Sequence, residues 1–197
     1  SPLAMNCSGK HAGMIRTAVV NSWSIASYRD PDHPMQLAIV QTIDDLAHEQ
    51  AANLAIDGCG APLYAISLYS LARAFGRIAS ASDGAEHRVA TALRSHPEYV
   101  SGTRRDELEL HRAIPGLMGK AGAESVYAVG LADGRGVAIK ISDGNPRARP
   151  VAMAGVLKRL GFDHETLDAQ VSTPVLGGGE RVGEIRPRKE TLAELGA

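Results

Sequence analysis

The amino-acid sequence predicts an α+β fold in which a helical cluster comes first and an antiparallel sheet follows. In residues 1–115, apolar side chains recur mainly at three- and four-residue spacing, which is typical of amphipathic helices. In residues 116–197 the pattern changes, because two apolar runs flank an Asp133-Gly134 turn and predict a β-hairpin. Helices and strands that are segregated in this way are typical of the α+β class. The length of 197 residues suits one domain, and we predict a single domain over 1–197.

Turn-forming residues set the expected boundaries of the elements. Asp32 or His33 before Pro34 predicts the start of a helix, and Gly161 predicts the end of another. The segment 56–62 is expected to be a loop, because two glycines flank Cys59. The predicted helices cover residues 10–23, 35–49, 63–78, 86–95, 105–114 and 149–160, with the last one packing on the sheet, and a final strand is expected in 180–187.

The composition excludes several classes of function. The formal net charge is -1, 22% of the residues are charged and 4% are aromatic, so nothing favours a nucleic-acid surface or an anionic membrane. The longest apolar run, near Leu63 to Ile66, is too short to span a bilayer. The first residues do not resemble a signal peptide, and two cysteines do not make a disulfide scaffold. We therefore expect a cytoplasmic protein that binds neither nucleic acid nor membranes.

The stretch NCSGKHAGM, residues 6–14, is too polar for a buried helix and calls for a chemical explanation. A phosphate loop is rejected, because His11 follows Gly9-Lys10 and no glycine precedes them at the required spacing. A serine nucleophile at Ser8 is also rejected, because a serine–lysine pair on one helix face needs the spacing S-x-x-K. That spacing does not occur anywhere in the sequence.

Metal binding explains the stretch better. Cys7 and Lys10 are three residues apart, so one helical turn would present both side chains on the same side. Together with the distant Cys59, they would offer two thiolates and one nitrogen, a donor set that suits zinc with a water as fourth ligand. The alternative is that both cysteines are buried structural thiols, because free cysteines are among the most buried residues.

Two lysines in the second half are weaker candidates. Lys120 begins KAG, which resembles the K-[ST]-G motif of penicillin-recognising serine hydrolases except that Ala121 replaces the hydroxyl residue. Lys140 lies on the predicted hairpin among apolar residues. It is either a functional lysine or an edge residue that extends its side chain so that the charged end reaches water.

Taken together, these segments resemble rhizobial-type (class 3) L-asparaginases, and the resemblance covers about residues 2–188. The pair NCSGKHAGM and DGCGAP is the most specific part. The segments that carry the resemblance, in the order shared with the family, are NCSGKHAGM, DPDHP, DGCGAP, LARAF, HPEYVSGTRR, GKAGAESVYAVGL and GVAIKISDGNPRARP. The resemblance implies a fold similar to serine β-lactamases and glutaminases, hydrolysis of L-asparagine to L-aspartate and ammonia, and a homodimer.

The resemblance also implies roles for individual residues. Cys7, Lys10 and Cys59 match the zinc-binding positions of the family, so zinc is the expected cofactor. Lys10, His11 and Asp57 match polar positions that line the substrate pocket, and Lys140 matches a lysine of the catalytic region. Asp57 is also expected to accept a hydrogen bond from Lys10 or from a metal-bound water.

One feature of the family is missing from this sequence. Family members carry S-x-x-K and a further active-site serine before the position of NCSGKHAGM, and neither is found here. We therefore expect the chain to be the C-terminal portion of such an enzyme, without the nucleophile segment and the N-terminal part of the family fold. The alternatives are a non-catalytic zinc-binding or association domain and, less in keeping with the motifs, a penicillin-recognising serine hydrolase.

Overall fold

The structure is a computed structural model that describes residues 5–188 and 190. It contains helices and small antiparallel sheets, which confirms the predicted α+β class. The chain divides into two compact units, with the boundary between Ser70 and Leu71. We call them the N-terminal and the C-terminal unit and describe each by itself; that they belong to a single domain stays a prediction.

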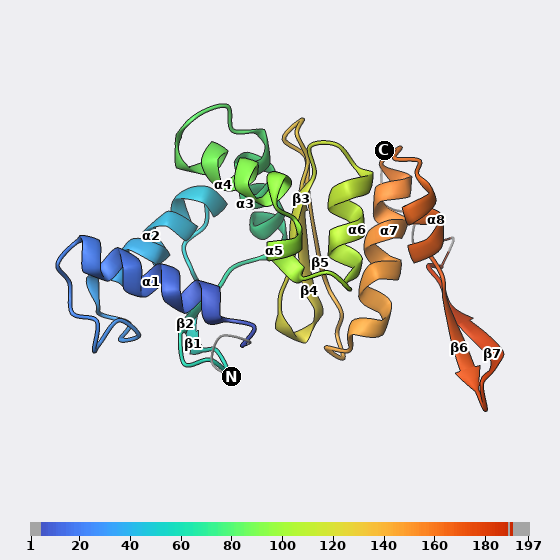
Figure 1. Ribbon diagram of the computed structural model, residues 1–197, viewed down its shortest axis with the longest axis horizontal. Helices are drawn as coiled ribbons and strands as arrows, with labels where there is room; N and C mark the ends of the chain where they lie inside the picture. Colours follow the sequence, from blue (N-terminus) through green and yellow to red (C-terminus); the bar gives the residue numbers. More distant parts are fainter. Residues whose placement is uncertain (1–4, 189, 191–197) are drawn as a thin grey trace. The chain divides into compact units, whose positions relative to one another are not determined.

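The N-terminal unit combines two helices with a short hairpin (Figure 1). It contains α1 (Ser8–Val20), α2 (Pro34–Ala47), β1 (Asn53–Ile56) and β2 (Pro62–Ala65). Helix α2 begins where the sequence predicted, because Pro34 occupies the first turn and the His33 side chain accepts a hydrogen bond from Met35 N at 3.0 Å. A small core of Met14, Ala18, Met35 and Ala61 joins the two helices to the hairpin, and Cys59 packs against it.

The C-terminal unit is built around a three-stranded sheet of order β3-β4-β5. Lys120, Ala128 and Ala138 are in register across the three strands. The elements of this unit are α3 (Leu68–Ser80, beginning just before the boundary), α4 (Gly84–Ser95), α5 (Glu98–Ser101), α6 (Asp106–Ala113), β3 (Met118–Ala121), β4 (Val126–Gly130), β5 (Gly136–Lys140), α7 (Arg149–Arg159), α8 (Glu165–Gln170), β6 (Thr173–Gly177) and β7 (Glu180–Ile185), with short 3₁₀ turns at Ala123–Ser125 and Pro146–Ala148.

Helices cover both faces of this sheet (Figure 1). On one face, the alternating strand residues Tyr127 and Val129 pack with α6, α7 and α8 in the main core of the protein. On the other face, α3 and α4 pack through a second core that includes Met118. The backbone of α3 comes so close to the sheet here that a Cβ at Gly130 or Gly136 would overlap carbonyl oxygens of the helix.

A buried charged cluster closes one end of the main core. Glu107 is fully buried, accepts a hydrogen bond from Ala121 N at 2.9 Å and lies 3.6 Å from the Arg149 guanidinium. Arg149 is also ion-paired with Asp106 and lies over the Tyr127 ring. Burial, and then the nearby carboxylates, raise the pKa of Tyr127 well above its usual value. The cluster therefore fixes the start of α6 to the start of α7.

The structure differs from the predicted elements in two respects. Residues 62–65 form a strand rather than the start of the predicted helix 63–78, because the 57–61 turn lets β2 pair with β1. Strands β1, β3 and β6 and helices α5 and α8 were not predicted; each is short, and periodicity is uninformative over four to six residues. On α1, Met14 and Ala18 join the core, whereas Ile15 and Val19 are exposed.

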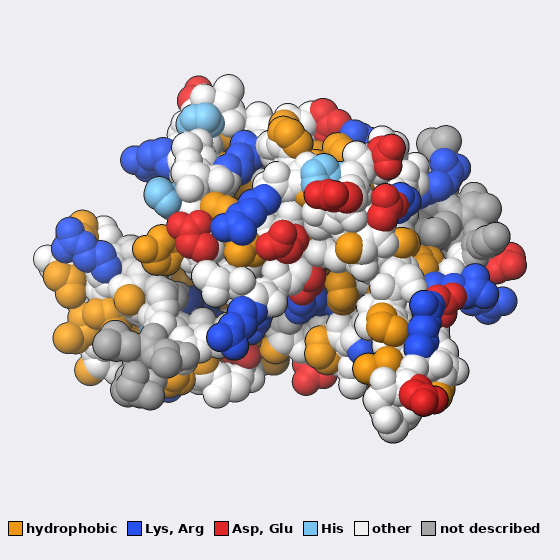
Figure 2. All heavy atoms as spheres, turned by 45° about the vertical axis from the view of Figure 1, so that its right-hand side comes forward, with side chains coloured by type: hydrophobic (Ala, Val, Ile, Leu, Met, Phe, Trp, Pro, Cys, Tyr) orange, Lys and Arg blue, Asp and Glu red, His pale blue; other side chains and the backbone are white. Residues whose placement is uncertain are grey.

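The surface carries mixed charges. On the face shown in Figure 2, acidic and basic side chains are interspersed over much of the visible surface, in line with the formal net charge of -1. Within the described part of the chain, none of the helices has the length and apolarity needed to cross a membrane.

The close approach of α3 to the sheet leads to a stability prediction. Replacing Gly136 with Ala places a methyl group against the Ala72 carbonyl and the Gly76 backbone, so the helix or the strand must shift. We expect Gly136→Ala to lower the free energy of unfolding by about 1–3 kcal/mol, as is usual for overpacking. Urea denaturation followed by circular dichroism measures this loss.

The matched control is Gly122→Ala in the same unit, where the nearest atom to an added Cβ is 3.8 Å away. This control should change stability by no more than about 0.5 kcal/mol. Equal effects of the two substitutions would contradict the close packing of α3 on the sheet.

Candidate functional site

The candidate site lies in the N-terminal unit, where the start of α1 meets the turn between β1 and β2. Cys7 is the residue before the first turn of α1, and Lys10 lies within that turn. Asp57 and Cys59 lie in the turn that follows β1. The structure thus brings together all three residues predicted to bind zinc, together with Asp57.

The geometry of the turn depends on its backbone. Asp57 N donates to Ala61 O at 2.9 Å, and Gly60 N donates to Asp57 O at 2.7 Å. Gly60 has a φ of 82°, a conformation that favours glycine, and the Arg29 guanidinium lies against its open side. The Asp57 carboxylate also accepts a hydrogen bond from Gly58 N at 2.8 Å, which fixes the orientation of this side chain.

Three functional groups, those of Lys10, Cys7 and Cys59, lie around the Asp57 carboxylate. Lys10 Nζ and Asp57 Oδ2 are 3.0 Å apart, which confirms the predicted hydrogen bond between these residues. Cys59 Sγ donates to the same oxygen at 3.2 Å. The donor atoms of Cys7, Asp57 and Cys59 all lie within 4.8 Å of one another.

The charges in the cluster influence one another. The hydrogen bonds from Lys10 and Cys59 lower the pKa of Asp57. Burial opposes protonation of Lys10, but its hydrogen bonds to Asp57 and Cys59 outweigh burial and raise its pKa. Burial and the neighbouring Cys59 thiol raise the pKa of Cys7. The metal-free cluster at neutral pH therefore contains an ammonium–carboxylate pair of Lys10 and Asp57 beside the protonated Cys7 thiol.

This donor set fits zinc. Two cysteine sulfurs and one carboxylate within 4.8 Å make up the three protein ligands that a zinc site with an open position requires. Lys10 is the fourth candidate, but it would have to lose its proton and leave Asp57 before it could bind a metal. Within residues 5–188 and 190, this is the one group of histidine, cysteine or acidic side chains with suitable spacing.

His11 belongs to the same helix but has a different partner. Its Nδ1 is 2.7 Å from the Tyr28 hydroxyl, whereas the buried Nε2 has no hydrogen-bond partner among the described residues. Tyr28 and Arg29 were not predicted to belong to the site. The available signal in the sequence was their position directly before the DPDHP segment. In the structure, Tyr28 contacts His11 and Arg29 lies against Gly60.

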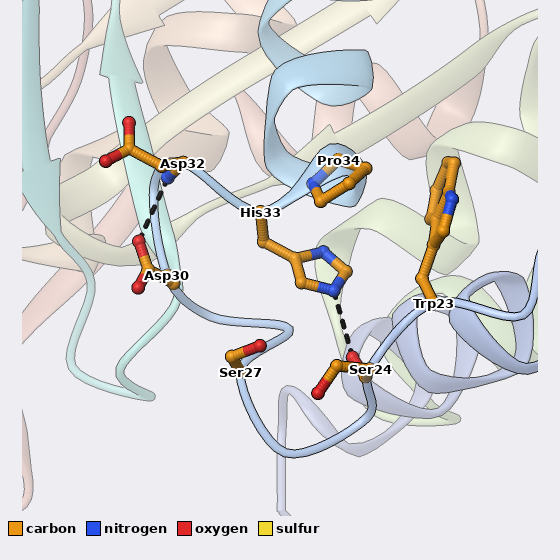
Figure 3. A pocket seen from close by; sticks show the side chains of 7 residues that line it. All are labelled: Trp23, Ser24, Ser27, Asp30, Asp32, His33 and Pro34. Carbon is orange, nitrogen blue, oxygen red and sulfur yellow. Dashed lines mark hydrogen bonds between the residues drawn. The ribbon is translucent and has the colours of Figure 1, made fainter.

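A separate pocket of about 330 Å³ lies on the segment between α1 and α2 (Figure 3). His33 sits at its centre, with Nε2 2.9 Å from Ser24 O and its ring edge-to-face with Trp23. Both His33 nitrogens are occupied, because Nδ1 accepts from Met35 N. The pocket is lined by Trp23, Ser24, Ser27, Asp30, Asp32, His33 and Pro34 and includes none of the predicted site residues.

The two candidate lysines of the second half lie in the C-terminal unit. Lys140 ends β5, is exposed, and its Nζ donates to the carbonyl oxygens of Glu124 and Ile141. Lys120 lies on β3, 3.8 Å from the buried carboxylate of Glu107. Both lysines thus have structural partners within their own unit, and the catalytic role of Lys140 stays a prediction.

The Lys10–Asp57 pair is partly exposed, so we expect it to contribute little to stability. The two side chains are 46% and 31% exposed, and ion pairs in such positions contribute about 0.2–1 kcal/mol. We expect a double-mutant cycle of Lys10→Met and Asp57→Asn to give a coupling energy in this range in urea denaturation. A coupling above about 2 kcal/mol would show that the pair is mainly structural.

Comparison with known proteins places the chain in a family. A search of curated proteins found no match. The family model for L-asparaginase II, in contrast, matches residues 1–187, which is nearly the whole sequence and includes both halves of the cluster. This match confirms the resemblance identified in the sequence, and the chain belongs to the L-asparaginase II family.

Proposed function

We propose that this protein takes part in the hydrolysis of L-asparagine to L-aspartate and ammonia. The observation that carries the proposal is the Lys10–Asp57 ion pair, fixed next to two cysteine thiols in a chain that belongs to the L-asparaginase II family. On the same family resemblance, we propose that the protein acts in the cytoplasm as a homodimer.

The charges of the site complement a free amino acid. At neutral pH asparagine carries one ammonium and one carboxylate, and Lys10 and Asp57 offer the opposite charges 3.0 Å apart. In the proposed complex, Lys10 pairs with the substrate carboxylate and Asp57 with the substrate ammonium, so the substrate replaces an exposed ion pair. His11, whose buried Nε2 has no hydrogen-bond partner among the described residues, would help to orient the substrate, as the family resemblance implies.

We further propose that the site holds one zinc ion. Cys7 and Cys59 would hold the metal together with Lys10, or with Asp57 if Lys10 keeps its proton. When bound, zinc would supply a fixed positive charge that polarises an oxygen of the substrate. The Gly58 N–H and the 57–61 turn would hold the Asp57 carboxylate in place in either arrangement.

The nucleophile is proposed to come from a segment outside these 197 residues. The serine–lysine mechanism that the family resemblance implies needs S-x-x-K, which the sequence does not contain. In this mechanism the serine attacks the side-chain amide, its paired lysine accepts the proton, and water hydrolyses the acyl intermediate after ammonia leaves. Lys140 would assist the transfer of protons.

Ammonia release tests the proposed activity. We expect the complete gene product to release ammonia from L-asparagine, measured by a coupled glutamate dehydrogenase assay. The 197-residue chain alone should bind asparagine without sustained turnover, because it lacks the proposed nucleophile. Nitrocefin serves as the control substrate and should not be hydrolysed.

Each other outcome contradicts a specific part of this proposal. A complete gene product that is inactive on both asparagine and glutamine would overturn the proposed substrate. Sustained turnover by the 197-residue chain would place the nucleophile within it. An inactive gene product that still binds zinc would favour the alternative of a non-catalytic zinc-binding domain, which the convergence of Cys7, Asp57 and Cys59 also supports.

Zinc binding leads to a separate prediction. Protein purified without chelator should contain one zinc per chain by inductively coupled plasma mass spectrometry. Cys59→Ala removes a sulfur donor, and we expect it to weaken zinc binding by more than the 10–100-fold (order of magnitude) that is typical of losing an outer-shell partner. Ser8→Ala, in the first turn of α1 next to Cys7, is the control, and this variant should keep its zinc. Equal zinc content in the two variants would refute the assignment.

A further inference from the structure

The chain has two cysteines in its whole sequence, and the fold brings them together. Cys7 and Cys59 are 52 positions apart, yet their sulfur atoms lie within 4.8 Å of each other. Both are free thiols and neither is fully buried, so a small oxidant in solution has access to them. Because no third cysteine exists, an intramolecular disulfide has one possible pairing.

We propose that Cys7 and Cys59 form a reversible disulfide under peroxide, and that this disulfide and the metal exclude each other. The disulfide itself rests on the geometry of the two thiols alone. Its consequence for activity rests on the proposed function, because it would remove both sulfur donors from the proposed zinc site.

The chemistry needs hydrogen peroxide as oxidant and proceeds in two balanced steps. One thiolate attacks a peroxide oxygen, so an S–O bond forms, the O–O bond breaks, and water leaves after protonation. The second thiol then attacks the sulfenic sulfur, so the S–S bond forms and a second water leaves. In total, two thiols are oxidised by two electrons and one peroxide is reduced to two waters.

The surroundings of both cysteines permit the small movement that an S–S bond requires. Cys7 precedes α1 and its side chain makes no capping hydrogen bond, so its rotation does not disturb the helix. Cys59 lies between Gly58 and Gly60, and a Cβ at Gly58 would meet no atom within 4 Å, so the turn has open space there. The main cost is the 3.2 Å hydrogen bond from Cys59 to Asp57, which would be lost.

The same sulfur atoms cannot be metal ligands and disulfide partners at once. Zinc binds thiolates, so a bound ion would occupy both sulfurs and protect them from peroxide. Oxidation would conversely release the ion. Reduction by a dithiol would restore both thiols, because exchange with an accessible disulfide is reversible.

Mass spectrometry of the intact chain tests the disulfide. After removal of metal with a chelator, we expect one equivalent of hydrogen peroxide to lower the mass by about 2 Da, the loss of two hydrogens, and dithiothreitol to reverse the change. Peptide mapping without reduction should recover the peptides of Cys7 and Cys59 as one linked species. Zinc added before peroxide should slow the reaction, and oxidation of the loaded chain should release zinc to a chromophoric chelator.

The single variants Cys7→Ser and Cys59→Ser provide the controls, because each retains one thiol and should gain oxygen mass instead of losing two hydrogens. Overoxidation of both cysteines in the unmodified chain, or linkage between two chains on a non-reducing gel, would overturn the inference. Zinc that does not slow the reaction would overturn the mutual exclusion. None of these readouts depends on turnover, so inactivity toward asparagine would contradict the proposed function and leave the disulfide result intact.

Discussion

The chemistry of the N-terminal unit depends on one turn of five residues, 57–61. This turn pairs β2 with β1 and returns the chain toward α1, so residues that are 47 positions apart in the sequence meet at the Lys10–Asp57 ion pair. Gly58 N donates to the Asp57 carboxylate and holds it in place, and the Cys59 thiol donates to the other oxygen of the same carboxylate. A turn without a glycine at position 60 would strain the backbone, because the φ of 82° there is costly for other residues.

The C-terminal unit is organised by a different constraint, which is the close approach of a helix backbone to a sheet. Gly76 on α3 and Gly130 and Gly136 on the strands have no side chain where the two backbones meet, so α3 packs directly on the sheet. The opposite face is filled by large side chains from α6, α7 and α8. The sheet thus has one face packed through glycine contacts and one face packed as an ordinary core.

The sequence predicted the long elements, and the residues that come together at the candidate site, better than it predicted the contacts between them. The α+β class, the start of α2 at Pro34 and the end of α7 before Gly161 followed from periodicity and from proline and glycine positions. The hairpin at the site did not, because β1 and β2 have four residues each and β2 continues into apolar residues that also suit a helix. Register and turn geometry are tertiary properties and have no local signal in segments this short.

The ligand set shows the same limit in chemical terms. The spacing of Cys7 and Lys10 correctly indicated that both side chains lie at the start of one helix. The hydrogen bond from Lys10 to Asp57 was expected, but the sequence could not show that Asp57 Oδ2 also accepts a hydrogen bond from Cys59, because that contact depends on the hairpin. Tyr28 and Arg29 were missed for the same reason, since they reach His11 and Gly60 only through the path of the segment between α1 and α2.

The protonation of Lys10 connects substrate binding, metal binding and the thiols. As an ammonium, Lys10 stabilises the charge of Asp57 and offers a positive group to a carboxylate, but it has no lone pair for a metal. As a neutral amine, it could bind a metal, and Asp57 would then lose its cation. Because its contacts raise the pKa of Lys10, the metal-free cluster favours the ammonium. A metal cation held by Cys7 and Cys59 would disfavour the nearby Lys10 ammonium, because two neighbouring positive charges repel each other. With the proposed metal bound, the same four side chains would take a second arrangement, and occupancy of the two sulfurs would decide between the two.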